Sequence, residues 1–170
     1  AFEVGEILFV SLDATKVGYL PDEQKTWLKQ LLTEHGQRYK RHVVFGHVPL
    51  RTFAIGRERD ILGDHELETL LQQANVDIFL NGHHHAYYPG YKDGIRYISQ
   101  ACLGAGPRNL LGTDQRSKRS ITVIEFEADG SYLIEAYQSP DFTRPVDIGT
   151  LPERIQTKWA VVIRNDLASE

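Results

Sequence analysis

Histidines follow two apolar segments of this 170-residue sequence, and in both places a glycine comes directly before the first histidine. The first segment, VVF, ends in Gly46 and His47, and the second, VDIFL, is followed by NGHHH, which contains residues 83–85. Neutral imidazole is the commonest metal ligand in proteins, and it suits Zn, Fe, Cu or Ni better than Mg or Ca. Two interpretations stand at this point, a metal site or histidines that are buried for structural reasons.

The surrounding pattern predicts an α/β unit, βαβαβ in order, that continues as antiparallel strands. A hairpin is expected around Asp129-Gly130, because an Asp-Gly pair between alternating segments favours a tight turn. No linker or internal repeat interrupts the chain, so we expect residues 1–170 to form a single unit. The expected strands are 6–13, 42–47, 76–85, 94–101, the two arms of 120–138, and 159–166, and the expected helices are 21–36 and 64–74.

This order explains how distant histidines could meet. A βαβ crossover makes its two strands parallel, so the carboxyl ends of strands 42–47 and 76–85 should lie at one edge of the sheet. His47 and His83 would then approach each other, although 36 positions separate them. In extended backbone His83 and His85 share a face and His84 points away. Three converging imidazoles are enough to hold a catalytic zinc ion.

Composition narrows the classes of partner. The net charge is −4, and no basic stripe interleaved with aromatic residues is present, so we expect no nucleic-acid partner. No apolar segment approaches the roughly 18 residues that span a bilayer, so we expect no membrane partner. The single cysteine, Cys102, allows no intrachain disulfide and no CxxC metal motif.

The two Gly-His motifs give the sequence a resemblance to a known superfamily. VVFGHVPL, followed by NGHHHAYYPG, resembles the GHxP-type and GHxH strand ends of the calcineurin-like metallophosphoesterases, which include the purple acid phosphatases. A Leu-Asp strand end at residues 12–13, a QxxWL pattern at 24–28 and LGAGPR at 103–108 also fit. The matched segments extend from about residue 7 to residue 107.

The resemblance implies a fold, a reaction and a set of ligands. The fold would be half of a four-layer α/β/β/α sandwich, and the reaction would be hydrolysis of a phosphate ester. His47 and His83 would bind one metal of a dinuclear centre and His85 the other, with metals drawn from Fe, Mn and Zn. Arg51, Arg108 and His84 are further candidates for binding the phosphate, because Arg suits bidentate phosphate recognition.

One departure from the superfamily is large. The DxH, GDxxD and GNH motifs, which supply the carboxylates and the asparagine of such a centre, are not in this sequence. Neutral imidazoles do not offset the repulsion between two cations, so carboxylates are needed to complete the site. We therefore expect the C-terminal half of an enzyme, inactive alone, whose exposed sheet surface pairs with a missing N-terminal half or with another copy.

Two other interpretations remain. The chain could be a self-contained mononuclear zinc hydrolase with three histidine ligands. It could also be a non-catalytic interaction module that keeps the fold without the chemistry.

Overall fold

The structure is a computed structural model that describes residues 1–168. A mixed sheet of eight strands, in the order β1-β2-β3-β4-β6-β5-β11-β10, forms its centre, and a second sheet has the order β7-β8-β9. The helices are α1 (Asp22–His35) and α2 (His65–Gln73), and short 3-10 turns are η1 (Gly36–Arg38), η2 (Ile148–Thr150) and η3 (Asn165–Leu167). The strands are β1 (Phe2–Val4), β2 (Ile7–Ser11), β3 (Arg41–Phe45), β4 (Ile78–Asn81), β5 (Tyr88–Lys92), β6 (Ile95–Ser99), β7 (Ser120–Phe126), β8 (Tyr132–Gln138), β9 (Arg144–Pro145), β10 (Arg154–Gln156) and β11 (Val161–Arg164).

Four neighbouring strands, β2, β3, β4 and β6, run parallel, with Val43 opposite Ile78 and Phe45 opposite Leu80 in the central pair. The predicted parallel arrangement of the two strands that precede the histidines is therefore confirmed. The predicted α/β class, with antiparallel strands following a βαβαβ unit, is confirmed as well.

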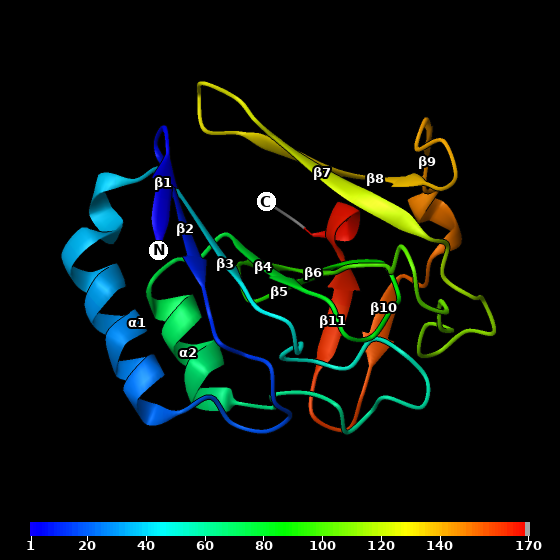
Figure 1. Ribbon diagram of the computed structural model, residues 1–170, viewed down its shortest axis with the longest axis horizontal. Helices are drawn as coiled ribbons and strands as arrows, with labels where there is room; N and C mark the ends of the chain where they lie inside the picture. Colours follow the sequence, from blue (N-terminus) through cyan, green and yellow to red (C-terminus); the bar gives the residue numbers. More distant parts are fainter. Residues whose placement is uncertain (169–170) are drawn as a thin grey trace.

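One side of the large sheet, the helix face, is covered by α1 and α2, which lie at the same side of the molecule (Figure 1). Val10 and Val44 on this face belong to the same buried cluster as Leu28 of α1 and Leu67 of α2. Asp64 caps α2 by accepting a hydrogen bond from the Leu67 N–H at 3.0 Å, as its place before an acidic first turn predicts. Within residues 1–168 no helix is long and apolar enough to cross a membrane.

The other side of the sheet, the hairpin face, is covered only in part. Figure 1 shows the β7–β8 hairpin as a separate layer above the large sheet. Phe126 of the hairpin meets Phe9 edge to face, with ring centroids 6.5 Å apart. The Arg96 guanidinium lies 4.9 Å from the Tyr132 ring centroid and donates to the Tyr132 hydroxyl at 2.7 Å. These contacts hold the hairpin over the edge of the sheet that is opposite to the edge where the histidines lie.

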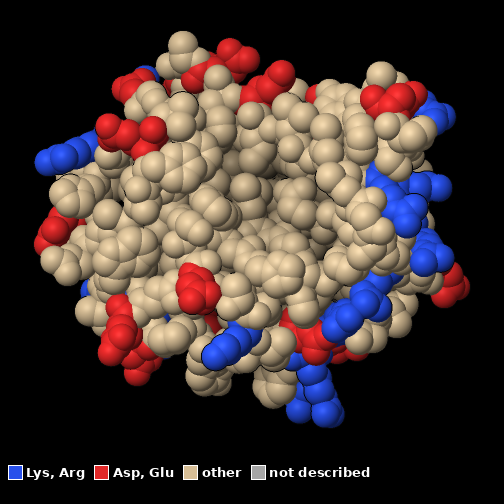
Figure 2. All heavy atoms as spheres, viewed as in Figure 1, with Lys and Arg blue, Asp and Glu red and all other residues tan. Residues whose placement is uncertain are grey.

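Uncharged surface remains between the hairpin and the large sheet. Figure 2 shows a hollow in this part of the molecule that is free of charged side chains and surrounded by them at its rim. Phe45 and Leu80 of the hairpin face are only partly buried. Phe2 and Val4 of the edge strand β1 are 52% and 58% exposed. The hairpin face is therefore the less completely covered side of the sheet.

Several short strands were not predicted. β1 is exposed at every residue and reverses into β2 at Gly5, which has a φ of 57°. β5 has the sequence YPGYK, and proline and glycine within a segment argue against a strand. Its Gly90 is required by packing, because a Cβ there would lie 2.5 Å from a Val162 methyl carbon. Pairing with β2 makes β1 a strand, and close packing makes β5 a strand although it contains proline and glycine.

Candidate metal centre

The two Gly-His turns lie side by side at the carboxyl edge of β3 and β4. The Gly46 N–H donates to the Leu80 carbonyl at 3.1 Å, and the Gly82 N–H donates to the His47 carbonyl at 3.0 Å. Gly46 is needed for close approach, because a Cβ at this position would lie 2.8 Å from the Ala14 Cβ. Main-chain hydrogen bonds between the turns therefore hold His47 beside His83.

The imidazoles of His47 and His83 face each other at this edge. His47 Nε2 and His83 Nδ1 are 3.2 Å apart, and the ring planes are inclined at 76°. Two imidazole nitrogens bound to one tetrahedral zinc ion at about 2.05 Å lie roughly 3.3 Å apart, so this spacing suits a shared ion. Without an ion it suits an N–H···N hydrogen bond. Burial, together with the charge of His47, lowers the pKa of His83 and favours the neutral imidazole that binds metals.

His85 is placed differently from the expectation. His83 and His85 have φ angles of 62° and 52°, so the backbone here is left-handed and not extended. His85 Nδ1 is buried without a hydrogen-bond partner. Among residues 1–168 no group of three or more His, Cys, Asp or Glu side chains has an arrangement that could hold a metal ion. The structure thus brings His47 and His83 together and leaves His85 outside that pair.

The His84 side chain is fully buried in the core. The Phe53 N–H donates to His84 Nδ1 at 3.1 Å, and His84 Nε2 donates to the Asp60 carbonyl at 2.9 Å. Burial lowers the pKa of His84 to about 4, which keeps the ring neutral. With both nitrogens bonded to the protein, His84 is a structural link to the 48–62 loop, and we do not keep it as a substrate ligand.

Arg51 is buried against α2. Its Nε donates to Glu68 Oε1 of α2 at 3.0 Å, and its Nη2 pairs with the other carboxylate oxygen. The Tyr97 hydroxyl also donates to Glu68 Oε1, at 3.2 Å. This network occupies the guanidinium, so Arg51 is not kept as a phosphate ligand either.

Arg108 is bound to the histidine segment and has an uncommitted side chain. Its N–H donates to the His85 carbonyl at 3.1 Å, and its carbonyl accepts from the Ser117 N–H at 2.9 Å. Its side-chain Nε is buried without a hydrogen-bond partner. Arg51 and Arg108 are the two predicted phosphate-binding arginines. Of these, only Arg108 lies beside a predicted metal ligand and has a side-chain donor without a hydrogen-bond partner.

Asp60 was not singled out from the sequence. Its Oδ2 lies 3.8 Å from His83 Nε2, and Arg57 pairs with the same oxygen. The Arg57 guanidinium, aided by His83, holds the pKa of the Asp60 carboxyl below its ordinary value. Nothing in the spacing of the RERDILG loop distinguishes Asp60 from its acidic neighbours, because its position depends on how the loop closes.

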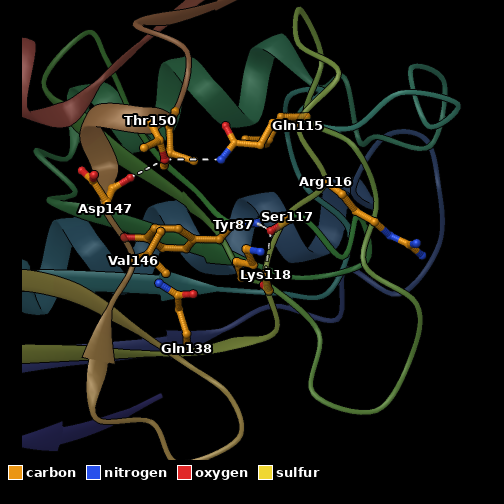
Figure 3. Close-up of a pocket in the computed structure, with 11 residues that line it drawn as sticks. Tyr87, Gln115, Arg116, Ser117, Lys118, Gln138, Val146, Asp147 and Thr150 are labelled. Atoms are coloured by element: carbon orange, nitrogen blue, oxygen red, sulfur yellow. Dashed lines mark hydrogen bonds between the residues drawn. The ribbon is translucent and has the colours of Figure 1, made fainter.

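Two cavities lie outside the histidine pair. One, of about 240 Å³, is lined by Tyr87, Gln138 and Thr150, and Figure 3 shows the Tyr87 ring extending toward residues 146–150. The other, of about 760 Å³, lies between α1 and α2 near Arg41 and Asp77. None of the three predicted metal ligands lines either of these two cavities.

The donors at the edge fit a metal in part. His47 Nε2 and His83 Nδ1 fit two ligands of one ion, and the unpartnered His85 Nδ1 is free to serve another. All three atoms are nitrogen donors that suit Zn or Fe. Further ligands, carboxylates above all, would have to come from other residues than these three.

Comparisons with known proteins give the chain its context. No family model matches it. The serine/threonine-protein phosphatase CPPED1 of Bos taurus is 31% identical over 135 residues, which cover 72% of this chain and 42% of that protein. The solved structure of GAP50, described as the anchor in the inner membrane complex of Plasmodium, matches with a TM-score of 0.60 at 18% identity, covering 78% of this chain and 44% of that chain. A dimetal phosphatase from Danio rerio matches with a TM-score of 0.47 at 16% identity, over 75% and 37% of the two chains. The chain spans less than half the length of each of these relatives.

Proposed function

The chain has a calcineurin-like metallophosphoesterase fold, and on that premise we propose that it forms part of a metal-dependent phosphatase that hydrolyses phosphate esters. The observation that carries the proposal is the 3.2 Å approach of His47 Nε2 to His83 Nδ1 at the carboxyl edge of two parallel strands. Open α/β sheets bind their ligands at this edge. The relative CPPED1, by its name, is a phosphatase that acts on phosphoserine and phosphothreonine.

In this proposal His47 and His83 bind one ion of a dinuclear centre, and His85 binds the second, with Fe, Mn or Zn as the metals. Such ions, when bound, lower the pKa of water and stabilise the entering and leaving oxygens of the phosphate. Arg108, whose main-chain N–H donates to the His85 carbonyl, binds a phosphate oxygen through its guanidinium. The buried His84 orients His83 and His85 by holding the turn between them.

The rest of the site comes from residues beyond these three histidines. Carboxylates are needed to offset the repulsion of two cations. The proposed source is an N-terminal half that packs on the hairpin face, where Phe45 and Leu80 are only partly buried and Phe2 is exposed. The uncharged hollow beneath the hairpin suits an apolar sheet (Figure 2). A second copy of the chain could occupy the same face, but it would bring no new carboxylate motif.

Two alternatives lead to different outcomes. A mononuclear zinc hydrolase needs His47, His83 and His85 on one ion, and His85 lies outside the pair among the described residues. A non-catalytic interaction module needs no metal and would use the hairpin face alone. Metal binding by histidine variants separates all three functions.

The test is a calorimetric titration of the 170-residue chain with Zn²⁺ and Mn²⁺. We expect His47→Ala and His83→Ala to weaken binding of the first ion by about tenfold or more, since each removes a ligand. His85→Ala should leave that ion bound. His35→Ala, at the exposed end of α1, is the matched control and should change nothing.

Three results would contradict parts of the proposal. Loss of the first ion in His85→Ala would favour the mononuclear zinc hydrolase. If no metal binds, or if His47→Ala binds metal as the unsubstituted chain does, the interaction module is favoured. Rapid hydrolysis of p-nitrophenyl phosphate by the isolated chain with added Mn²⁺ or Zn²⁺ would show that no second half is required.

A further inference from the structure

The two nitrogens of the His83 ring have different surroundings. Nδ1 faces His47 Nε2 at 3.2 Å, which is the side on which an ion would lie under the proposed function. Nε2 is buried and has no hydrogen-bond partner. A histidine that binds metal through one nitrogen usually donates its other N–H to a carboxylate, carbonyl or water, which fixes the tautomer and the ring orientation. His83 Nε2 therefore lacks the acceptor that such a ligand requires.

Asp60 is placed to be that acceptor. Its Oδ2 lies 3.8 Å from His83 Nε2, within ion-pair distance and slightly too far for a hydrogen bond. The residue is tethered, because its carbonyl accepts from His84 Nε2 at 2.9 Å and its N–H donates to the Arg57 carbonyl at 3.0 Å. Arg57 also pairs with the carboxylate itself. One loop residue thus contacts the side chains of two consecutive histidines.

We propose that Asp60 is the positioning carboxylate of His83, which holds His83 in the Nε2–H tautomer so that Nδ1 is presented to the metal. The inference rests on the proposed function, since it takes the His47–His83 pair as a metal site. A shift of less than 1 Å would bring the carboxylate into hydrogen-bond range of Nε2. Its negative charge would also make the imidazole a stronger ligand.

The geometry favours positioning over direct ligation. Nδ1 and Nε2 lie on opposite sides of the imidazole ring, so a carboxylate facing Nε2 is turned away from an ion on Nδ1. In the described part of the chain Asp60 joins no metal-binding group of three residues. Glu58, two residues earlier in the same loop, is exposed, and its carboxylate accepts from the Gly56 N–H at 3.0 Å. It provides a matched control.

The first test measures Zn²⁺ affinity of the 170-residue chain by competition with a chromophoric chelator. Asp60→Ala should weaken binding by about 10- to 100-fold, the usual effect of removing a carboxylate behind a metal-bound histidine. Asp60→Asn keeps an acceptor oxygen and should recover part of that loss. Glu58→Ala should bind as the unsubstituted chain does. Thermal unfolding of all three variants without metal checks that the loop is still folded.

The second test needs no metal and uses nitrogen NMR of the imidazoles to assign the His83 tautomer. We expect Nε2–H in the unsubstituted chain and a mixture of tautomers in Asp60→Ala. Nδ1–H in both proteins, or zinc affinity within about twofold of the unsubstituted chain in Asp60→Ala, would overturn the inference. Zinc affinity that is insensitive to His83→Ala would instead overturn the proposed metal site, so the two failures are distinguishable.

Discussion

The two faces of the large sheet are covered to different extents. On the helix face Val10, Val44 and the helix residues Leu28 and Leu67 are fully buried in one cluster. On the hairpin face Phe45 and Leu80 stay partly exposed, and Figure 2 shows an uncharged hollow on this view of the molecule. The helix face therefore supplies much of the stability of this chain by itself. The hairpin face is the surface on which added protein would contribute most.

The largest expected effect comes from the buried ion pair beneath the helix face. Arg51→Ala leaves the Glu68 carboxylate buried with fewer partners, and we expect a loss of about 3–5 kcal/mol in the free energy of unfolding. Urea denaturation monitored by circular dichroism measures it. Arg59→Ala, at an exposed position of the neighbouring loop, serves as the control. A loss below about 1 kcal/mol would mean that Glu68 finds water or another cation.

Leucine truncation compares the two faces directly. Leu67→Ala on α2 removes a fully buried side chain and should cost about 2–5 kcal/mol of unfolding free energy. Leu80→Ala on β4 removes one on the hairpin face that is only partly buried and should cost less, about 1–2 kcal/mol. The same urea titration measures both. Similar losses at the two positions would contradict the difference between the faces.

Acidification should weaken the helix face through Glu68. Burial raises the pKa of its carboxyl, but Arg51, Lys92 and the Tyr97 hydroxyl outweigh burial and leave the pKa below its ordinary value of 4.5. A depressed carboxyl pKa stabilises the fold above the unfolded-state value, and this contribution is lost as the pH falls through the folded-state value. The stability difference between the chain and its Glu68→Gln variant should thus be constant above about pH 5 and shrink below it. A difference that grows on acidification would refute this assignment.

A much smaller effect on stability than that of Leu67→Ala is expected at the edge of the hairpin face. Phe2 stacks on Phe9 with ring centroids 5.0 Å apart, yet it is 52% exposed. Phe2→Ser should change the free energy of unfolding by about 1 kcal/mol or less, because little area is buried. It should lower the binding of a hydrophobic dye, measured by fluorescence. Unchanged dye binding would indicate that β1 is not part of an exposed apolar surface.

Much of the fold followed from local pattern. The helices expected at 21–36 and 64–74 and the turn expected at Asp129-Gly130 agree with the structure to within a few residues. The short strands β1 and β5 did not follow, because exposure and a Pro-Gly pair hide their strand character. They form because neighbouring strands offer them hydrogen bonds and packing.

The candidate site, like the fold, could be predicted only in part from the sequence. The Gly-His spacing and the rule that βαβ strands are parallel were enough to place His47 beside His83. The left-handed backbone of His83 and His85 could not be read from the sequence, because non-glycine residues adopt it only under tertiary constraint. The extended arrangement expected for these residues was therefore wrong.

The sequence by itself determined which strand ends meet, because chain connectivity and handedness leave one arrangement for two parallel strands joined by a helix. Only the tertiary structure decided which side chains are free to act there. Arg51 is consumed by Glu68, whereas Arg108 keeps an unbonded nitrogen. The Asp60 carboxylate lies near His83 because His84 donates a hydrogen bond to the Asp60 carbonyl and so holds the loop in place. Such choices depend on loop closure and on competition for hydrogen bonds, which residue order does not encode locally.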